Sequence, residues 1–206
     1  MTLPSTLPRK LAVHFARFGP YHLSRLGTAA QLLAPDGWQL IGLETAAQDR
    51  TYAWRHENGA TPFERHTVFP QAAGEGLPAR ELRRGMAAAL TQLRPQAVAI
   101  AGWATPDARA CRVWCRRQGV RAILMSDTRA ADGNRVWLKE AFKRHLLRDF
   151  DAALVAGRSH RDYLISLGFP AERIAFGFDV VDNDYFRTAS THWRSQQGRP
   201  DRPYLL

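Results

Sequence analysis

The stretch AVAIAGWATPDA, residues 97–108, decides the fold class. Its first part, AVAIAGW (97–103), is apolar without the alternation of a half-exposed strand, which is typical of a strand buried on both faces of a parallel sheet. A helix start follows at once, with Thr105 as the N-cap and Pro106 as the first helical residue. The stretch therefore predicts one strand-to-helix unit of an α/β protein.

The same unit recurs along the chain on both sides of this stretch. Strands are predicted at 10–16, 38–44, 63–69, 121–126 and 151–157, with a short one in RIAFGF (173–178). Helices are predicted at 19–34, 79–93, 134–150 and 159–167, the third with Leu138, Phe142 and Leu146 on its apolar face. Alternating units of this length predict a Rossmann-like parallel sheet with helices on both faces, in one α/β domain.

The charge balance is strongly basic. Lysine and arginine total 29 against 19 aspartate and glutamate residues, which gives a net charge of +10. Such a chain attracts anions, and charge alone does not choose among nucleic acid, an acidic membrane surface and phosphorylated small molecules. Neither a membrane-spanning run nor a secretory signal is recognisable, so we expect a cytoplasmic protein. Cys111 and Cys115 have no histidine nearby, so we expect reduced thiols and no bound metal.

Candidate site residues lie where the predicted strands end, because ligands of parallel α/β sheets bind outside the carboxyl ends of the strands. These ends fall at 16–22, 102–106, 126–135 and 156–160. At the first end, a glycine bend opens a helix, whose N–H groups and positive dipole end form either an anion site or only a packed turn. The candidate substrate-binding residues are Gly19, Pro20, Tyr21, His22, Trp103, Ser126, Arg129, Gly157 and Arg158, and Asp127 is the candidate catalytic carboxylate.

A basic stripe runs along the helix predicted at 134–150. Arg135, Lys139 and Lys143 recur at i, i+4 and i+8 and so share one side of the helix. The stripe is explained either by a solvated helix face or by a surface for anionic lipid or phosphate, which the neighbouring Trp137 would suit. The sequence leaves both explanations open.

Motifs of several common chemistries are missing from the sequence. HExxH, GxSxG, GxxxxGK[ST] and a spaced cysteine–histidine cluster do not occur. Zinc catalysis, serine hydrolysis and Walker-type phosphate binding therefore lose their usual support. No helix-turn-helix or RNA-recognition motif is recognisable either. Only the positive net charge suggests nucleic-acid binding, so nucleic acid is not expected as a partner.

The segment AALVAGRSHRDYLISLGFPAERIAFGFDVVDNDYF, residues 152–186, resembles the end of the N-terminal domain of family 4 glycosyltransferases, which have the two-domain GT-B fold. The shared pattern is a strand followed by glycine, a helix ending in LG, a proline, a short strand reading RI, and a VDN..F elbow. The matching positions are Leu167, Gly168, Pro170, Arg173, Ile174, Val181, Asp182, Asn183 and Phe186. Residues 10–34 and 120–150 are also similar to this family.

The resemblance implies an acceptor-side domain at 1–186 and, at 187–206, a linker that leads to the first strand (PYLL) of a donor-binding domain. It also implies a retaining transfer of a sugar from a nucleoside diphosphate sugar to a hydroxyl of a glycan or lipid-linked acceptor, without a cofactor or a metal. The donor-binding glutamates of this family belong to the other domain. Residues 1–206 alone should therefore not catalyse transfer. Peripheral contact with the inner face of the membrane is a further expectation.

One departure from the family pattern concerns the end of the strand RAILMS. Many family members have a histidine there, whereas this chain has Ser126 and Asp127, and the departure weakens a catalytic role for either residue. The alternative to a glycosyltransferase is a stand-alone Rossmann-like module that binds nucleotides or nucleic acid without catalysis. Residues 45–78 carry no recognisable pattern and are compatible with an acceptor cleft or with an ordinary surface loop.

Overall fold

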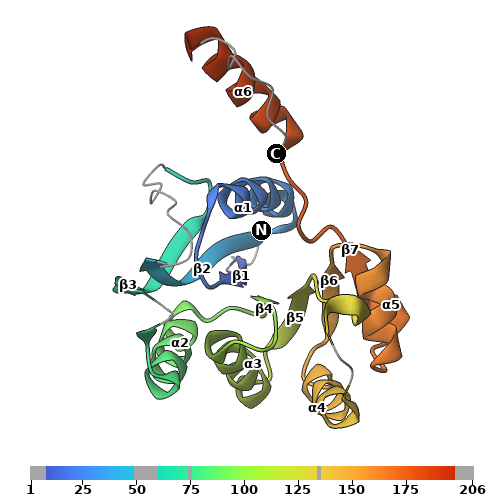
Figure 1. Ribbon diagram of the computed structural model, residues 1–206. Helices are drawn as coiled ribbons and strands as arrows, with labels where there is room; N and C mark the ends of the chain where they lie inside the picture. Colours follow the sequence, from blue (N-terminus) through green and yellow to red (C-terminus); the bar gives the residue numbers. More distant parts are fainter. Residues whose placement is uncertain (1–7, 49–59, 74–75, 134–135, 198–206) are drawn as a thin grey trace, which may run out of the picture.

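The strands form one sheet in which all neighbours run parallel. The computed structural model describes residues 8–48, 60–73, 76–133 and 136–197. Within these ranges the sheet has seven strands in the order β3-β2-β1-β4-β5-β6-β7 (Figure 1). The strands are β1 Arg9–Phe15, β2 Trp38–Gln48, β3 Glu64–Ala73, β4 Ala97–Ala101, β5 Arg121–Ser126, β6 Ala152–Val155 and β7 Ile174–Phe176. The Rossmann-like fold class predicted from the sequence is confirmed.

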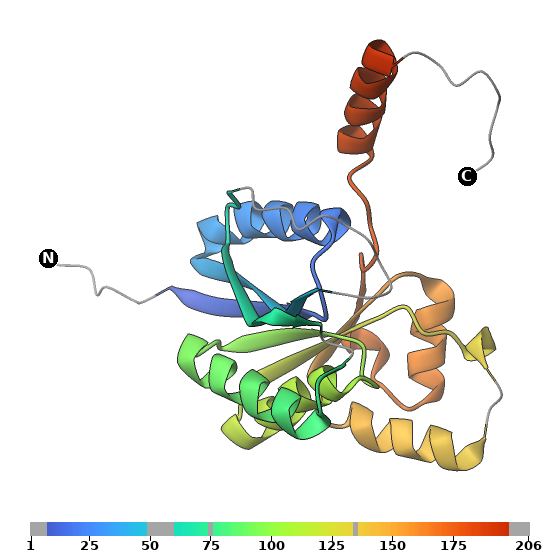
Figure 2. The same cartoon turned by 60° about the vertical axis from the view of Figure 1, so that its left-hand side comes forward.

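The helices cover the two faces of the sheet unequally. They are α1 Pro20–Leu33, α2 Ala79–Leu93, α3 Pro106–Gln118, α4 Trp137–Leu147, α5 Arg158–Ser166 and α6 Asn183–Gln197. The buried residues of α1 pack in one apolar cluster with Val13, Leu40 and Met125, whereas α2, α3, α4 and α5 contribute to a larger cluster on the opposite face. Figures 1 and 2 show α1 on one side of the sheet and α2, α3 and α4 on the other.

This imbalance follows from the path of the chain. From β1 the chain moves outward through α1 to β2 and then β3, and it returns through α2 to the other side of β1, where β4 to β7 follow in order. Because crossovers between parallel strands are right-handed, the reversal of direction puts α1 on one face and the later helices on the other. The order therefore reverses between β1 and β4, and within the residues that the structure describes no crossover helix lies over β4 to β7 on the α1 face.

The helix α4 differs from its sequence prediction in the side that it buries. Leu146 and Leu147 are buried, but Leu138 and Phe142, predicted for the same apolar face, are 59% and 51% exposed. Apolar spacing identifies a helix but does not say which apolar residues find a partner, and here the contact with the sheet is made by the last turn of α4. Of the predicted apolar face, Leu146 is therefore buried, whereas Leu138 and Phe142 are exposed.

The end of the described part of the chain is helical. Residues Asn183–Gln197 form the helix α6, which extends away from the sheet (Figure 2). The elbow predicted to end at Phe186 thus already contains the first turn of a helix. The PYLL segment lies outside the described residues. No helix in the described ranges is both long and apolar enough to cross a membrane.

Candidate functional site

The candidate functional site is the edge of the sheet at the carboxyl ends of β1 and β4, which we call the crevice after the place where ligands bind in such sheets. In open parallel sheets ligands bind where the strand order reverses, and the reversal lies between these two strands. The loop after β1 leads into α1, and the loop after β4 leads into α3. In the second loop Gly102 has φ of 75°, a left-handed conformation that glycine adopts without strain, and its N–H donates to the carbonyl of Met125 at 2.8 Å.

The first turn of α1 presents the positive end of a helix dipole at this crevice. Gly19 is the N-cap, Pro20 is the first helical residue, and the first turn contains no acidic residue. The N–H of Gly19 donates to Nδ1 of His22 at 2.9 Å, which fixes the imidazole over the helix start. The ring of His22 also lies against Phe15, with 4.2 Å between the ring centroids. A helix start of this kind favours an anionic ligand.

His22 is held in its neutral form by its surroundings. Burial, with a further contribution from the charge of Arg25, lowers the pKa of His22 from 6.5 to about 4. The unfolded chain therefore takes up a proton at His22 as the pH falls below 6.5, while the folded chain does so only near 4. His22 thus stabilises the fold above pH 6.5, and this contribution is lost between pH 6.5 and 4.

We expect the His22→Gln variant to lose less stability than the wild type on acidification. Glutamine at the third helical position accepts the same hydrogen bond from the N-cap N–H but does not titrate. Urea unfolding of both proteins at pH 7 and pH 4.5 measures the difference, which should reach at most about 3 kcal/mol for a pKa shift of this size. Equal losses in the two proteins would show that His22 does not carry this pH dependence.

A buried polar cluster lies directly beneath the crevice, and the sequence analysis missed it. It joins His14 of β1, Thr45 of β2 and Asp107 of the first turn of α3, which are 1%, 2% and 5% exposed. The Thr45 hydroxyl donates to Asp107 Oδ2 at 2.8 Å, so it accepts from Nε2 of His14 at 3.0 Å. His14 Nε2 is also 3.4 Å from Asp107 Oδ2.

The cluster keeps Asp107 ionised. Burial alone would raise the pKa of Asp107, but the hydrogen bond and charge of His14, together with the Thr45 hydroxyl, outweigh burial and hold that pKa well below its usual range. Nδ1 of His14 is buried and has no hydrogen-bond partner in the described part of the chain. The cluster thus ties two strands and a helix together at the crevice floor.

Glu44 braces the loop that leads into α1. It is fully buried, and its two carboxylate oxygens accept from the backbone N–H of Phe18 at 2.6 Å and from the Thr67 hydroxyl at 2.8 Å. The signal for Glu44 and His14 was present in the sequence, since His14 interrupts the apolar run of its predicted strand and Glu44 directly follows the apolar run LIGL. A polar residue at such a position needs a buried partner.

The predicted residues after β4 and β5 have different environments. Trp103 is buried in the large core cluster and does not line the surface of the crevice. Ser126 is 2% exposed, and its hydroxyl accepts from the N–H of Thr128 at 3.2 Å, so it shapes the turn. Asp127 is exposed. No group of three or more histidine, cysteine, aspartate or glutamate side chains in the described ranges could hold a metal ion.

Two of the predicted cations, Arg129 and Lys143, are paired with nearby side chains. Arg129 pairs with Asp132 at 3.0 Å in an exposed turn. Lys143 contacts Glu140 at 3.0 Å and the Tyr163 hydroxyl at 2.6 Å, so it joins α4 to α5 and does not extend a free stripe. The remaining candidates are Gly157, the N-cap of α5, the exposed Arg158 and Lys139, and Arg135, which lies outside the described residues.

The elbow after β7 crosses to the first turns of α1. Arg25 donates to the carbonyl of Val180 and pairs with Asp179 at 3.1 Å. The Ser24 hydroxyl donates to Asp182 at 3.4 Å, and Phe186 packs on Tyr21 with 4.9 Å between the ring centroids. The VDN..F elbow is thus fixed beside the candidate site, and the chain leaves the sheet there.

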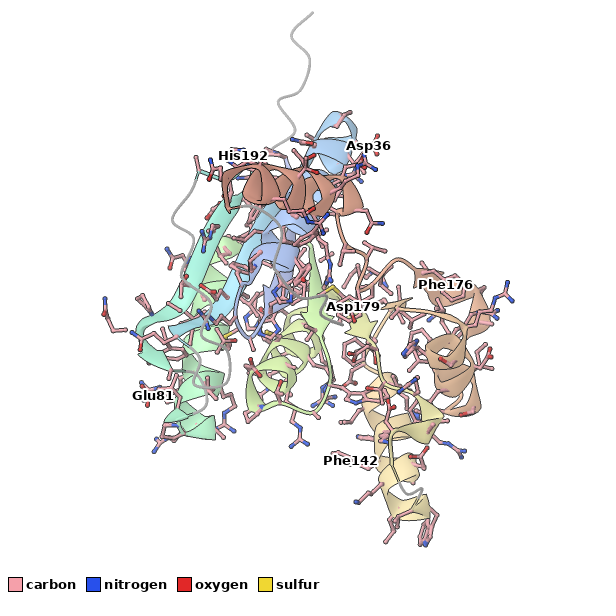
Figure 3. The ribbon with its side chains drawn as sticks, turned by 45° about the horizontal axis from the view of Figure 1, so that its top comes forward. Asp36, Glu81, Phe142, Phe176, Asp179 and His192 are labelled. Carbon is pink, nitrogen blue, oxygen red and sulfur yellow. The ribbon has the colours of Figure 1, made fainter. Side chains whose placement is uncertain are left out.

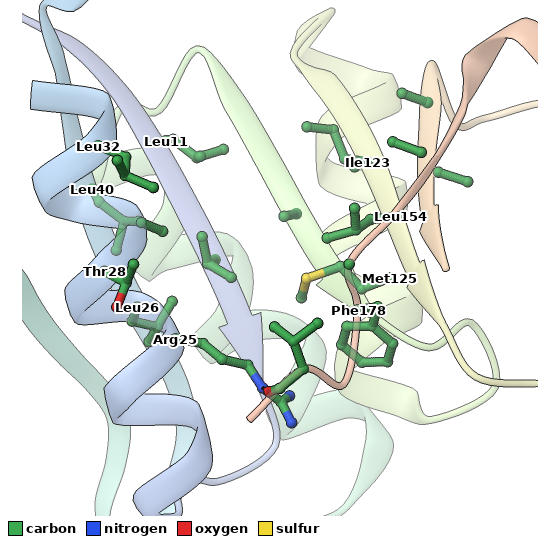
Figure 4. A pocket seen from close by; sticks show the side chains of 18 of the residues that line it. Leu11, Arg25, Leu26, Thr28, Leu32, Leu40, Ile123, Met125, Leu154 and Phe178 are labelled. Atoms are coloured by element: carbon green, nitrogen blue, oxygen red, sulfur yellow. Dashed lines mark hydrogen bonds between the residues drawn. The ribbon is translucent and has the colours of Figure 1, made fainter. Parts of the chain in front are cut away.

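An apolar groove lies between α1 and this elbow, on the α1 face of the sheet, where no crossover helix in the described residues covers β4 to β7. It has a volume of about 970 Å³. Figure 4 shows Arg25 and Phe178 at one end and Ile123, Met125 and Leu154 along the sheet. Faces of parallel sheets are normally covered, so this groove is an apolar surface without a cover in the described residues.

This fold corresponds to one half of a GT-B protein. The chain is similar to the UDP-GlcNAc 2-epimerase from Neisseria meningitidis bound to UDP-GlcNAc, with a TM-score of 0.60 and 13% identity over 95% of this chain and 54% of that one. It is also similar to the UDP-N-acetylglucosamine 2-epimerase from Rickettsia bellii (TM-score 0.56, 15% identity, 95% and 50% coverage). A third similar structure is UGT2 of Phytolacca americana (TM-score 0.50, 11% identity, 88% and 55% coverage).

These likenesses establish the fold and no more, because the identities are low. The chain spans about half the length of each of these solved structures. No protein-family model matches the sequence, and no curated protein matches it either.

Proposed function

We propose that the chain is the acceptor-side half of a retaining GT-B glycosyltransferase, which moves a sugar from a nucleoside diphosphate sugar to a hydroxyl of a glycan or lipid-linked acceptor. Three observations support the proposal: the half-GT-B fold, the crevice at the strand reversal, and the family 4 resemblance of residues 152–186. The donor nucleotide would be held mainly by the second half.

The elbow is the observation that carries the proposal. Residues 179–186 are fixed to α1 through Arg25, Ser24 and Tyr21, beside the helix start at the crevice. A chain that leaves the domain at this point would bring a following donor-binding half to face the crevice. The apolar groove next to the elbow is then where we expect a helix of that second half to pack, since it would cover the exposed sheet face.

The chemistry requires stabilisation of a diphosphate leaving group. Helix starts and cations supply it without a metal, because they place partial or full positive charge where negative charge develops. The start of α1 is suited to this task, since its first turn has no acidic residue and its histidine is uncharged at neutral pH. Asp127, exposed at the end of β5, is proposed to contact the acceptor.

Titration calorimetry with UDP, GDP and ADP tests the division of labour between the two halves. We expect the 206-residue chain alone to bind each nucleotide with a dissociation constant weaker than about 1 mM, and the complete enzyme to bind one of them at least about 100-fold more tightly. Tight binding by the chain alone would contradict the proposal and support the stand-alone nucleotide-binding module.

A reaction assay separates transfer from epimerisation, the second candidate, which the likeness to two UDP-GlcNAc 2-epimerases favours. The complete enzyme is incubated with nucleoside diphosphate sugars, with and without an acceptor. A glycosyltransferase releases the nucleoside diphosphate and forms a new glycosidic bond when the acceptor is present. Conversion of the sugar nucleotide into its epimer without an acceptor would instead establish an epimerase.

A further inference from the structure

The outward face of α4 combines exposed apolar side chains with cations. Trp137, Leu138 and Phe142 are 74%, 59% and 51% exposed and occupy its first turns. Arg144 and Arg148, also exposed, continue the same side toward the end of the helix. Positions 137, 138, 141, 142, 144, 145 and 148 fall within one half of a helical wheel; the buried Leu146 lies at the edge of this half, one turn after Phe142, and the buried Leu147 lies outside it.

This face carries no acidic side chain. The only acid within α4 is Glu140, which lies at the edge of this face beside Trp137 and Arg144 and bonds to Lys143 and Tyr163. The next acid along the chain, Asp149, pairs with Arg112 and Arg116. A further cation comes from α3, where the guanidinium of Arg109 lies 6.0 Å from the ring centroid of Phe142. The exposed charges around the apolar side chains are therefore positive.

We propose that this outward face of α4 is a docking surface for an anionic lipid bilayer. An interfacial helix places aromatic and aliphatic side chains at the boundary of headgroups and acyl chains, while its arginines and lysines contact anionic headgroups. Charge complementarity favours an anionic bilayer over a second copy of the chain as the partner. Two copies, each with a net charge of +10, repel each other.

The position of α4 agrees with this role. The helix lies on the opposite side of the sheet from α1, and Phe142 lies far from His192 of α6 (Figures 1 and 3). A bilayer on α4 would therefore leave the apolar groove and the elbow accessible. The inference does not depend on sugar transfer, because vesicle binding is measured without any donor or acceptor.

The apolar part is tested by co-sedimentation with vesicles of phosphatidylcholine containing about 30% phosphatidylglycerol. The double variant Trp137→Ser/Leu138→Ser is expected to bind about ten-fold more weakly than the wild type, because it loses the side chains that enter the interface. The matched control is Leu32→Ser, since Leu32 is 71% exposed on α1, and its binding should equal that of the wild type. All three side chains are exposed, so circular dichroism should show unchanged folding and melting.

The charged part is tested in the same assay. Arg144→Gln/Arg148→Gln should bind about 30-fold more weakly at low salt, which corresponds to about five-fold for each cation removed near the surface. Arg80→Gln/Arg83→Gln on α2 removes the same charge from another exposed helix face and should bind within about two-fold of the wild type. Vesicles of phosphatidylcholine alone should bind much less of every protein.

Three results would overturn the inference. The first is no preference for anionic vesicles. The second is an equal loss of binding in the α2 and α4 charge variants, which would show a diffuse effect of net charge. The third combines two observations: the wild type does not bind vesicles, and sedimentation velocity without vesicles shows that it forms an oligomer. The Trp137→Ser/Leu138→Ser variant would be monomeric in the same experiment. That result would make the outward face of α4 a contact between copies.

Discussion

Replacement of Asp107 by asparagine is expected to lower the free energy of unfolding by about 1–3 kcal/mol, the usual cost of leaving a buried hydrogen-bonding group without its partner. The carboxylate of Asp107 receives the Thr45 hydroxyl at 2.8 Å and lies 3.4 Å from His14 Nε2. Asparagine has nearly the same shape, so the loss would come from the charge and the hydrogen bonds. Urea unfolding at pH 7 measures it.

A matched control is Asp132→Asn. Asp132 is also hydrogen-bonded and paired with an arginine, Arg129, but in an exposed turn, so its replacement should change stability far less. A loss for Asp107→Asn no larger than that of the control would show that the buried cluster does not stabilise the fold. The double variant His14→Leu/Asp107→Leu should lose less than the sum of the two single leucine variants, because neither partner is left stranded.

The pH dependence of Asp107 separates it from His22. Because the folded-state pKa of Asp107 lies below its unfolded value of 3.8, its contribution is present above pH 4 and is lost only as the pH falls further. The His22 contribution is lost earlier, between pH 6.5 and 4. Acid unfolding of the wild type should therefore have two components, of which Asp107→Asn removes the more acidic one.

The sheet could be predicted from the sequence because its strands are buried on two faces. Continuous apolar runs such as 97–103 and 121–126, each followed by a helix start, leave few arrangements other than a parallel α/β sheet. The same apolar runs predict where each strand ends. They do not predict that the crevice lies between β1 and β4, because the strand order depends on long-range packing.

The contacts of the site were harder to predict for physical reasons. His14, Thr45 and Asp107 lie 31 and 62 residues apart along the chain and meet only through the sheet register and the placement of α3. The sequence predicts Trp103 as a substrate-binding residue and Lys143 as part of a basic surface, yet Trp103 packs in the core and Lys143 bonds to Tyr163. Residue type suggests what a side chain can do, whereas its neighbours decide whether it is free to do it.

The largest functional effect is expected from His22→Glu in the complete enzyme. Glutamate at the third helical position is a good capping residue, so the start of α1 should remain stable. If the diphosphate of the donor lies at this helix start, the new carboxylate repels it. At about 6 Å and an effective dielectric constant of about 20 the repulsion is about 3 kcal/mol, so kcat/KM for the sugar nucleotide should fall about 100-fold.

His22→Gln is the control that isolates charge in this experiment, because glutamine and glutamate have the same length and accept the same hydrogen bond from Gly19. The glutamine variant should keep kcat/KM within about five-fold of the wild type, since His22 is itself neutral at pH 7. If the site excludes water, raising the salt concentration should reduce the difference in kcat/KM between the two variants only slightly. Equal kcat/KM values for the two variants would place the diphosphate away from α1 and leave the helix start with a structural role.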